Sequence, residues 1–250
     1  MALVHSLEKN GNKLFKYRGQ IPVFLFLLSI PVVYFTDYQF LKECDHLDVI
    51  LLITCVIFSL AGQIIRAIAI GTSSKHTSGR NTKEGQVAEA LNTKGIYSTV
   101  RHPLYLGNYF MWIGIVMYSY NVYFVIIVSL LFWLYYERIM FAEERFLERK
   151  FGEAYVNWSM KVPAFWPSLK NKIPSDIPFS MKTILRREYS GISATIIGFV
   201  FVDFLRDWFV AGEVQLKWIH LIVFVSALMF SLILRSLKHY TKVLYEADRS

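Results

Sequence analysis

The chain has 250 residues, of which 54% are hydrophobic and 16% aromatic, and its mean hydropathy is +0.37. This composition excludes an ordinary soluble domain and is typical of a small membrane protein that crosses the bilayer several times. The formal net charge is +8. The basic residues lie between the apolar segments, where they act as topological signals, so no nucleic-acid partner is expected.

Six apolar segments are predicted to be transmembrane helices. Each is about 17–24 residues long, which is enough to cross a hydrocarbon core of about 30 Å. In chain order they are 20–36, 47–70, 103–119, 121–141, 191–210 and 216–235. We therefore expect the fold class to be an all-α integral membrane protein with about six transmembrane helices.

The basic residues predict the orientation of these segments. They are frequent in the N-terminal stretch, in 71–101, in 138–187 and in the C-terminal tail, and scarce in 37–46 and 206–217. With six crossings all the basic stretches fall on one side, which the positive-inside rule identifies as the cytoplasm. Both termini are then cytoplasmic. The first segment is expected to be retained, because no small-residue cleavage site follows it.

The third and fourth segments are predicted to form a tight antiparallel hairpin, about 103–141. Only the turn Ser119–Asn121 separates them. A chain that enters at His102 and turns on the far side returns to the same depth near residue 141. Glu143 and Glu144 are therefore expected to lie close to His102.

Residues 142–162 are predicted to form a cytoplasmic interfacial helix. Aromatic and aliphatic residues recur there at helical spacing with charges between them, and Gly152 is expected to interrupt the helix. A linker with four prolines follows, at Pro163, Pro167, Pro174 and Pro178.

Arg101 and His102 stand where the third segment enters the membrane, a place where polar side chains are costly without partners and are often functional. Pro103 suits the first turn of a helix, because its missing N–H costs nothing there. The two side chains and the free N–H groups after Pro103 are predicted to form a cationic helix start that can hold an anion.

Several motifs together resemble the isoprenylcysteine carboxyl methyltransferase and phospholipid methyltransferase superfamily, whose members are integral membrane enzymes that use S-adenosylmethionine. The resemblance covers roughly residues 60–167. It rests on residues 60–71, 95–107, Glu143–Glu144, 151–155 and Val162–Pro163, in the family's order and spacing.

The resemblance implies a role for each matching residue. The residues implied to bind the cofactor are His102, Pro103, Tyr105, Leu106, Gly107, Glu143 and Glu144. Arg101 and Arg138 are the candidate catalytic residues. Arg138 is placed like the arginine that handles the acceptor in the prenylcysteine enzymes. No metal is implied.

The implied reaction moves a methyl group from S-adenosylmethionine to a membrane lipid or lipidated substrate. The enzyme has to align donor and nucleophile and exclude water. A phospholipid amine, a prenylcysteine carboxylate and an acidic lipid phosphate remain open as acceptors. The donor is water-soluble and the acceptor lies in the bilayer, so the active site is expected at the cytoplasmic rim of the hairpin.

Structural explanations of the same residues remain open. Arg101 could be a topological anchor, His102 could bond backbone at a helix start, and the two glutamates could be solvated. Arg66, near the inner end of the second segment, could extend its charge to the interface.

Two other functions also remain open. A membrane reductase of the sterol-reductase type, using NADPH, shares the Arg-His-Pro-x-Tyr-x-Gly stretch. In these reductases a glutamate usually follows the glycine of this stretch, whereas this chain has Asn108 there. The reductases also lack the Glu-Glu and Phe-Gly patterns that this chain has. A non-catalytic membrane scaffold is the other alternative.

Three regions are expected along the chain: an N-terminal segment 1–46, a methyltransferase core 47–170 and an extension 171–250 with two membrane helices. The extension lies outside the resemblance and contains the basic stretch 182–187. The loop 71–94 could cover the site or be a plain connector. Cys44 and Cys55 lack metal-ligand spacing and are expected to be ordinary residues.

Overall fold

The computed structural model describes residues 2–38, 45–73, 80–82, 85–214, 217–247 and 249. Helices account for most of them. They are α1 (Leu3–Tyr17), α2 (Ile21–Phe35), α4 (Asp45–Gly71), α5 (Pro103–Met117), α6 (Val122–Phe151), α7 (Glu153–Ser159), α8 (Met181–Ala211) and α9 (Trp218–Tyr240), with a 3-10 turn, η1 (Gly95–Ser98). Two short antiparallel strands, β1 (Arg80–Thr82) and β2 (Gly85–Val87), precede η1.

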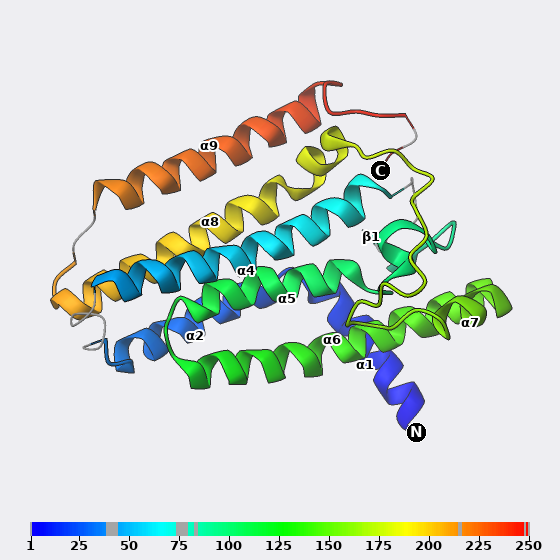
Figure 1. The fold of residues 1–250 in the computed structure, drawn as a ribbon, viewed down its shortest axis with the longest axis horizontal. Coiled ribbons are helices and arrows are strands. Elements are labelled where there is room, and N and C mark those ends of the chain that lie inside the picture. The colour runs from blue at the N-terminus through cyan, green and yellow to red at the C-terminus, as the bar shows by residue number, and fades with distance from the viewer. Residues whose placement is uncertain are drawn as a thin grey trace.

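The long helices lie side by side along one axis, and α1 packs across the last part of α6 (Figure 1). Both termini lie at the end of the bundle where α5 begins and α6 ends (Figure 1). Arg249 is part of this end, because its guanidinium donates to the carbonyl of Gly71 at 3.0 Å. The start of α4, the turn between α5 and α6 and the end of α8 lie at the other end (Figure 1).

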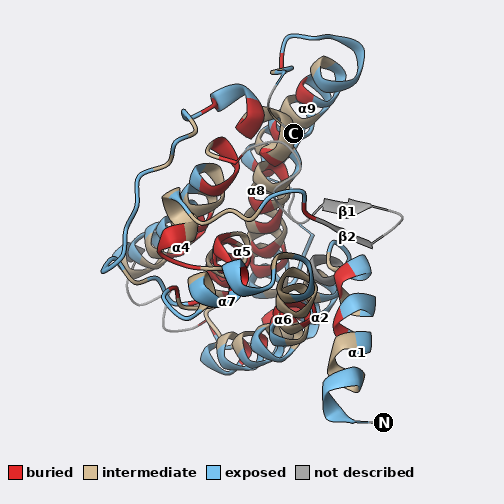
Figure 2. Cartoon of the chain, turned by 90° about the vertical axis from the view of Figure 1, so that its right-hand side faces the viewer, coloured by how far each residue is buried: buried red, intermediate tan, exposed pale blue. Residues whose placement is uncertain are grey.

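Among the residues that the structure describes, three helices are long and apolar enough to cross a membrane by length and composition: His46–Gly71, Val122–Phe151 and Trp218–Tyr240. Much of their outer surface is exposed (Figure 2). On α4 a stripe at helical spacing is more than half exposed, formed by Ile50, Ile53, Ile57, Leu60 and Ile64. Such a contiguous apolar face is what a helix presents to lipid. The predicted helical membrane protein is therefore supported, with the short strands β1 and β2 as an addition, while six crossings and an interfacial helix stay predictions.

The α5–α6 hairpin has the predicted form. The helices are joined by the residues Tyr118 to Asn121, and the Asn121 side chain accepts a hydrogen bond from the Phe124 N–H at 3.0 Å, capping α6. Tyr120 adopts a positive φ of 54° in this turn. Its hydroxyl donates to the Asp48 carboxylate at 3.0 Å, which ties the turn to the start of α4.

Helices α4 and α5 approach closely because glycines face each other. A Cβ added at Gly62 would lie 2.5 Å from the carbonyl oxygen of Gly107, and one added at Gly114 would lie 2.5 Å from that of Cys55. Ser59 donates to the Met111 carbonyl at 2.8 Å across the same contact. Small residues at a helix interface let the backbones meet, as is common in membranes.

Two helix boundaries differ from the prediction. Helix α6 continues about ten residues beyond the predicted end at 141, so 142–151 belongs to it and not to a separate interfacial helix. The break at Gly152 is confirmed, with φ 53°, and α7 has only seven residues. Helix α8 begins at Met181, ten residues before the predicted 191, so the basic stretch 182–187 is helical. Helix α1 was not predicted.

The far end of the bundle is held by Arg206. Its Nη2 lies 2.8 Å from an Asp48 carboxylate oxygen, and its guanidinium carbon lies 4.7 Å from the ring centre of Tyr118 and 4.4 Å from that of Tyr120. These contacts join α8, the start of α4 and the hairpin turn. Cys55, in α4, is buried and free, consistent with an ordinary residue. Cys44 lies outside the described residues.

We predict that Gly62→Ala destabilises the protein by about 1–3 kcal/mol, because the new methyl meets backbone atoms of α5 that cannot move aside. The free energy of unfolding in detergent measures this. Gly19→Ala is the matched control, since nothing lies within 4 Å of a Cβ added there. Equal stability of the two variants would contradict the close packing of α4 and α5.

Candidate active site

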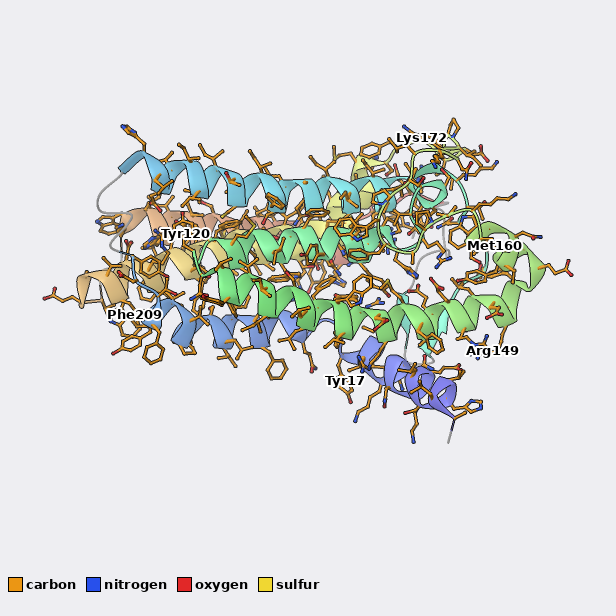
Figure 3. The ribbon with its side chains drawn as sticks, turned by 60° about the horizontal axis from the view of Figure 1, so that its bottom comes forward. Tyr17, Tyr120, Arg149, Met160, Lys172 and Phe209 are labelled. Carbon is orange, nitrogen blue, oxygen red and sulfur yellow. The ribbon has the colours of Figure 1, made fainter. Side chains whose placement is uncertain are left out.

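A cavity of about 600 Å³ lies where α5 begins and α6 ends. This volume is in the range of small-molecule sites. It is at the same end of the bundle as Arg149, Met160 and Lys172, opposite Tyr120 and Phe209 (Figure 3). Helices α4, α5, α6, α7 and α8 all contribute lining residues, and so does the stretch before η1.

The backbone before α5 is fixed by the proline-rich linker. The N–H groups of Arg101 and His102 donate to the carbonyls of Pro163 and Ala164 at 2.9 and 3.2 Å. Further along, the Ser168 N–H donates to the Thr99 carbonyl at 2.9 Å. The linker therefore runs beside this strand-like segment and satisfies its polar groups, which holds the two side chains in place.

The hairpin brings the acidic pair of α6 to this point. His102 Nε2 lies 2.8 Å from a Glu144 carboxylate oxygen, and Arg101 Nε lies 3.1 Å from the same oxygen. The Tyr105 hydroxyl donates to Glu143 at 2.8 Å, and His102 Nδ1 lies 3.7 Å from that carboxylate. Because a carboxylate only accepts, Nε2 carries the proton in the contact with Glu144.

This arrangement changes the predicted anion site. The N–H groups of Tyr105 and Leu106 both donate to the His102 carbonyl at 3.1 Å, so they are not available to an anion. The carboxylate of Glu144 lies against Arg101 and His102, where a bound anion was expected. One arginine faces two carboxylates in this cluster, and His102 donates a hydrogen bond to one of them, which favours a cationic ligand group.

A second polar group lines the cavity from α4, α5 and α8. Arg66 and Glu188 form a bidentate pair at 2.6 and 2.7 Å, and Glu188 is 2% exposed. Arg66 also donates to the Asn108 side-chain oxygen at 2.5 Å, and Asn108 donates to the Tyr136 hydroxyl at 3.1 Å. Arg66 is thus paired inside the bundle and does not extend to the interface.

Sequence reasoning missed most of this group. Glu188 directly follows the basic stretch 182–187, outside the resemblance, and Tyr136 is one of many aromatic residues in a membrane helix, so neither gives a signal. Asn108 was noted only for its difference from the reductases. Asn108 directly follows the Arg-His-Pro-x-Tyr-x-Gly stretch, and this position is the signal in the sequence that it belongs to the site.

The predicted site residues are not all at the cavity. Pro103 and Tyr105 line it. Leu106 is 1% exposed and packs in the core with Tyr136. Gly107 makes room for the Arg66 side chain, since a Cβ added at Gly107 would lie 2.5 Å from Arg66 Cγ. The Arg138 guanidinium donates to the Leu134 carbonyl at 2.6 Å, one turn back on its own helix, and does not line the cavity.

Two tyrosines outside the long helices add hydroxyl groups. Burial, with a contribution from the charge of Glu143, raises the pKa of Tyr97 to about 12. Burial and the charge of Glu144 raise the pKa of Tyr155 well above its usual value. Both phenols line the cavity and stay protonated at neutral pH, so they can donate hydrogen bonds to a ligand.

A cluster at the opposite end, Asp203, Asp207 and His220, has the residue types of a metal site, with the possible ligand atoms within 4.8 Å of one another. Its charges are already paired. Lys217 Nζ lies 2.6 Å from Asp207, and His220 Nε2 lies 2.7 Å from Asp203. Arg206 Nη1 lies 3.9 Å from Asp203. We interpret the cluster as a structural ion-pair network.

Residues 50–154 match the family model of phospholipid methyltransferases. The chain is similar to protein-S-isoprenylcysteine O-methyltransferase of Xenopus laevis, 32% identical over 54% of this chain and 46% of that protein. The Schizosaccharomyces pombe enzyme of the same name is 32% identical over 44% of this chain and 47% of that protein. These findings confirm the resemblance to the superfamily.

A relative with another name also matches. The nickel-cobalt-cadmium resistance protein NccN of Alcaligenes xylosoxydans xylosoxydans is 33% identical over 34% of this chain and 39% of that protein. The chain spans about half the length, or less, of the curated relatives it matches. No solved structure matches.

We predict that Arg66→Met lowers the free energy of unfolding by about 3–5 kcal/mol, because it leaves the Glu188 carboxylate buried without its partner. The double variant Arg66→Met, Glu188→Met recovers most of this loss, since it removes both charges. Chemical denaturation in detergent measures both. Arg149→Met is the control, because its ion pair with Glu8 is exposed and contributes about 0–1 kcal/mol. A double variant no better than Arg66→Met would contradict the pairing.

Proposed function

We propose, from the premise that residues 50–154 match the phospholipid methyltransferase family, that this chain is an integral membrane methyltransferase. It moves a methyl group from S-adenosylmethionine to a lipid-linked acceptor. The observation that carries the proposal is the joining of His102 and Tyr105 with Glu143 and Glu144 at one cavity. Two ends of one hairpin supply these residues, in the order that the superfamily has them.

The residues at the cavity fit the cofactor. The carboxylates of Glu143 and Glu144 can accept hydrogen bonds from an ammonium group and ribose hydroxyls. The Asn92 side-chain nitrogen is buried at the cavity and has no hydrogen-bond partner among the described residues, so it can donate to the carboxylate of an amino-acid moiety. His102 and Tyr105 stack with ring centres 5.5 Å apart and form a flat wall.

When bound, S-adenosylmethionine supplies a methyl group on a sulfonium, which passes to an acceptor oxygen as the carbon–sulfur bond breaks, leaving S-adenosylhomocysteine. The chain's own residues bind and orient. Arg101 and His102 hold Glu144, and Tyr105 holds Glu143. The cavity is also lined by Ala88, Ala90, Leu91, Asn92 and Trp158, which exclude water from the reacting groups.

The acceptor that we propose is a carboxylate on a lipid-linked group, such as a prenylcysteine. A carboxylate is ionised at neutral pH and needs no base. Arg18 and Arg187 line the cavity and suit an anionic head group, while Met111 and Trp112 give it an apolar inner part. Arg138 has no role in this proposal, because it lies away from the cavity. We propose that the site and both termini face the cytoplasm, where the donor is found.

We predict that S-adenosylhomocysteine binds the purified protein and that His102→Ala or Glu144→Gln weakens this binding about 10–100-fold, the range for a charged hydrogen bond. Isothermal titration calorimetry measures it. Glu137→Gln is the control, since that carboxylate is exposed on the same helix. Unaltered affinity in both site variants would refute the site. NADPH binding without S-adenosylhomocysteine binding would indicate a reductase, and binding of neither would favour a scaffold.

We also predict that membranes containing the protein gain a lipid-linked species heavier by one methyl, absent with Glu144→Gln. Tritiated methyl donor followed by lipid extraction measures this. Mild base distinguishes the acceptors, because a methyl ester releases methanol whereas a methylamine does not. Base-stable label would contradict the carboxylate and indicate a phospholipid amine or a lipid phosphate as the acceptor.

A further inference from the structure

The inner part of the cavity is built largely from helices outside the family match. Phe26 belongs to α2, and Gly191 and Ala194 belong to α8, whereas residues 50–154 supply Met111 and Trp112. Small side chains on α8 leave room there: a Cβ added at Gly191 would lie 3.7 Å from Glu188 Oε2 and 3.8 Å from Met111 Cε. The five residues themselves carry no ionisable side chain, and both oxygens of the neighbouring Glu188 carboxylate already accept from Arg66. This inner part suits a hydrocarbon chain.

A second, narrow cavity of about 20 Å³ continues the first toward the far end of the bundle. Its lining residues come from α2, α5, α6 and α8, with Ser119 just after α5, and include Leu25, Ile115, Val116, Phe124 and Val202. The two serines at its wall are not available to a ligand. Ser29 donates to the Phe26 carbonyl and Ser119 to the Val116 carbonyl, both at 2.7 Å. The second cavity is therefore apolar in effect.

Phe26 and Trp112 line both cavities and separate them. Their ring centres are 6.1 Å apart at an interplanar angle of 85°, an edge-to-face contact. Phe201 of α8 packs behind Phe26, with ring centres 5.4 Å apart, and lines neither cavity. Phe201 thus supports the Phe26–Trp112 pair from α8, and the two rings form a wall between the first and the second cavity.

We propose that the Phe26–Trp112 pair is a stop that limits the length of the acceptor's hydrocarbon chain. The chain lies in the inner part of the first cavity, against Met111 and Gly191, and its end meets the two rings. Beyond them the second cavity is too narrow to receive it while both rings are present. This proposal rests on the proposed function for the methyl transfer, and on the geometry of the two cavities for the stop.

The test compares acceptors that differ only in chain length: the S-geranyl, S-farnesyl and S-geranylgeranyl derivatives of N-acetylcysteine. Phe26→Ala and Trp112→Ala join the two cavities, so the ratio of kcat/KM for the longest acceptor to that for the shortest rises at least tenfold over the unaltered protein. Phe201→Ala is the matched control. It removes the same ring from behind Phe26 and leaves the wall standing, so its ratio stays within about twofold. All variants must bind S-adenosylhomocysteine as the unaltered protein does.

A second measurement does not depend on turnover. Alkyl carboxylates of the three lengths, each with a diazirine at the chain end, are photolysed with the protein, and the labelled peptides are identified by mass spectrometry. In the unaltered protein the longest chain that binds labels Phe26, Met111 or Trp112. In Trp112→Ala the label moves to Ile115 or Val202.

The outcomes separate the two proposals. Correct labelling with no methyl ester formed on any of the three S-alkyl N-acetylcysteines would refute the proposed acceptor and leave the stop supported. Methylation with the same length profile in Trp112→Ala, Phe26→Ala and the unaltered protein would refute the stop and leave the function supported. Labelling confined to residues outside both cavities would also refute the stop.

Discussion

The contact of Arg101 and His102 with Glu144 is the interaction on which the site depends. Charges at the membrane boundary are stable only when they are paired and hydrogen-bonded. The pairing needs the α5–α6 hairpin to have matched arms, and it needs the linker carbonyls of Pro163 and Ala164 to hold the segment before α5. A sequence that keeps these charges must therefore also keep the hairpin and the linker.

A second constraint acts through the close approach of α4 and α5. Without a side chain at Gly107, Arg66 crosses the surface of α5 and reaches Asn108 on one side and Glu188 on the other. The pair Arg66–Glu188 in turn fixes α8 against the first cavity. The extension is thus part of the same structure as the core, because separating the two would leave the buried Glu188 carboxylate without the guanidinium that pairs with it.

The hairpin and the nearness of Glu143 and Glu144 to His102 could be predicted, since segment lengths and one turn determine them. The C-terminal end of α6 could not be predicted. Charges after residue 141 indicated that the helix left the membrane, whereas Arg101, His102 and Tyr105 give those charges partners inside the bundle and the helix continues. The Arg66–Glu188 pair joins residues 122 positions apart and leaves no periodic pattern to read.

The two halves of the cavity are therefore supplied by different parts of the chain. The polar half comes from residues around His102 and Glu144, within the stretch that matches the family, so similarity to named methyltransferases bears mainly on this half. The apolar half takes Phe26 from α2 and Gly191 from α8, where no family match extends. Relatives that share residues 50–154 can differ in both helices, and hence in the shape offered to a hydrocarbon chain. A change of side chains in these two helices would alter the apolar half of the cavity and leave the hairpin and its acidic pair unchanged.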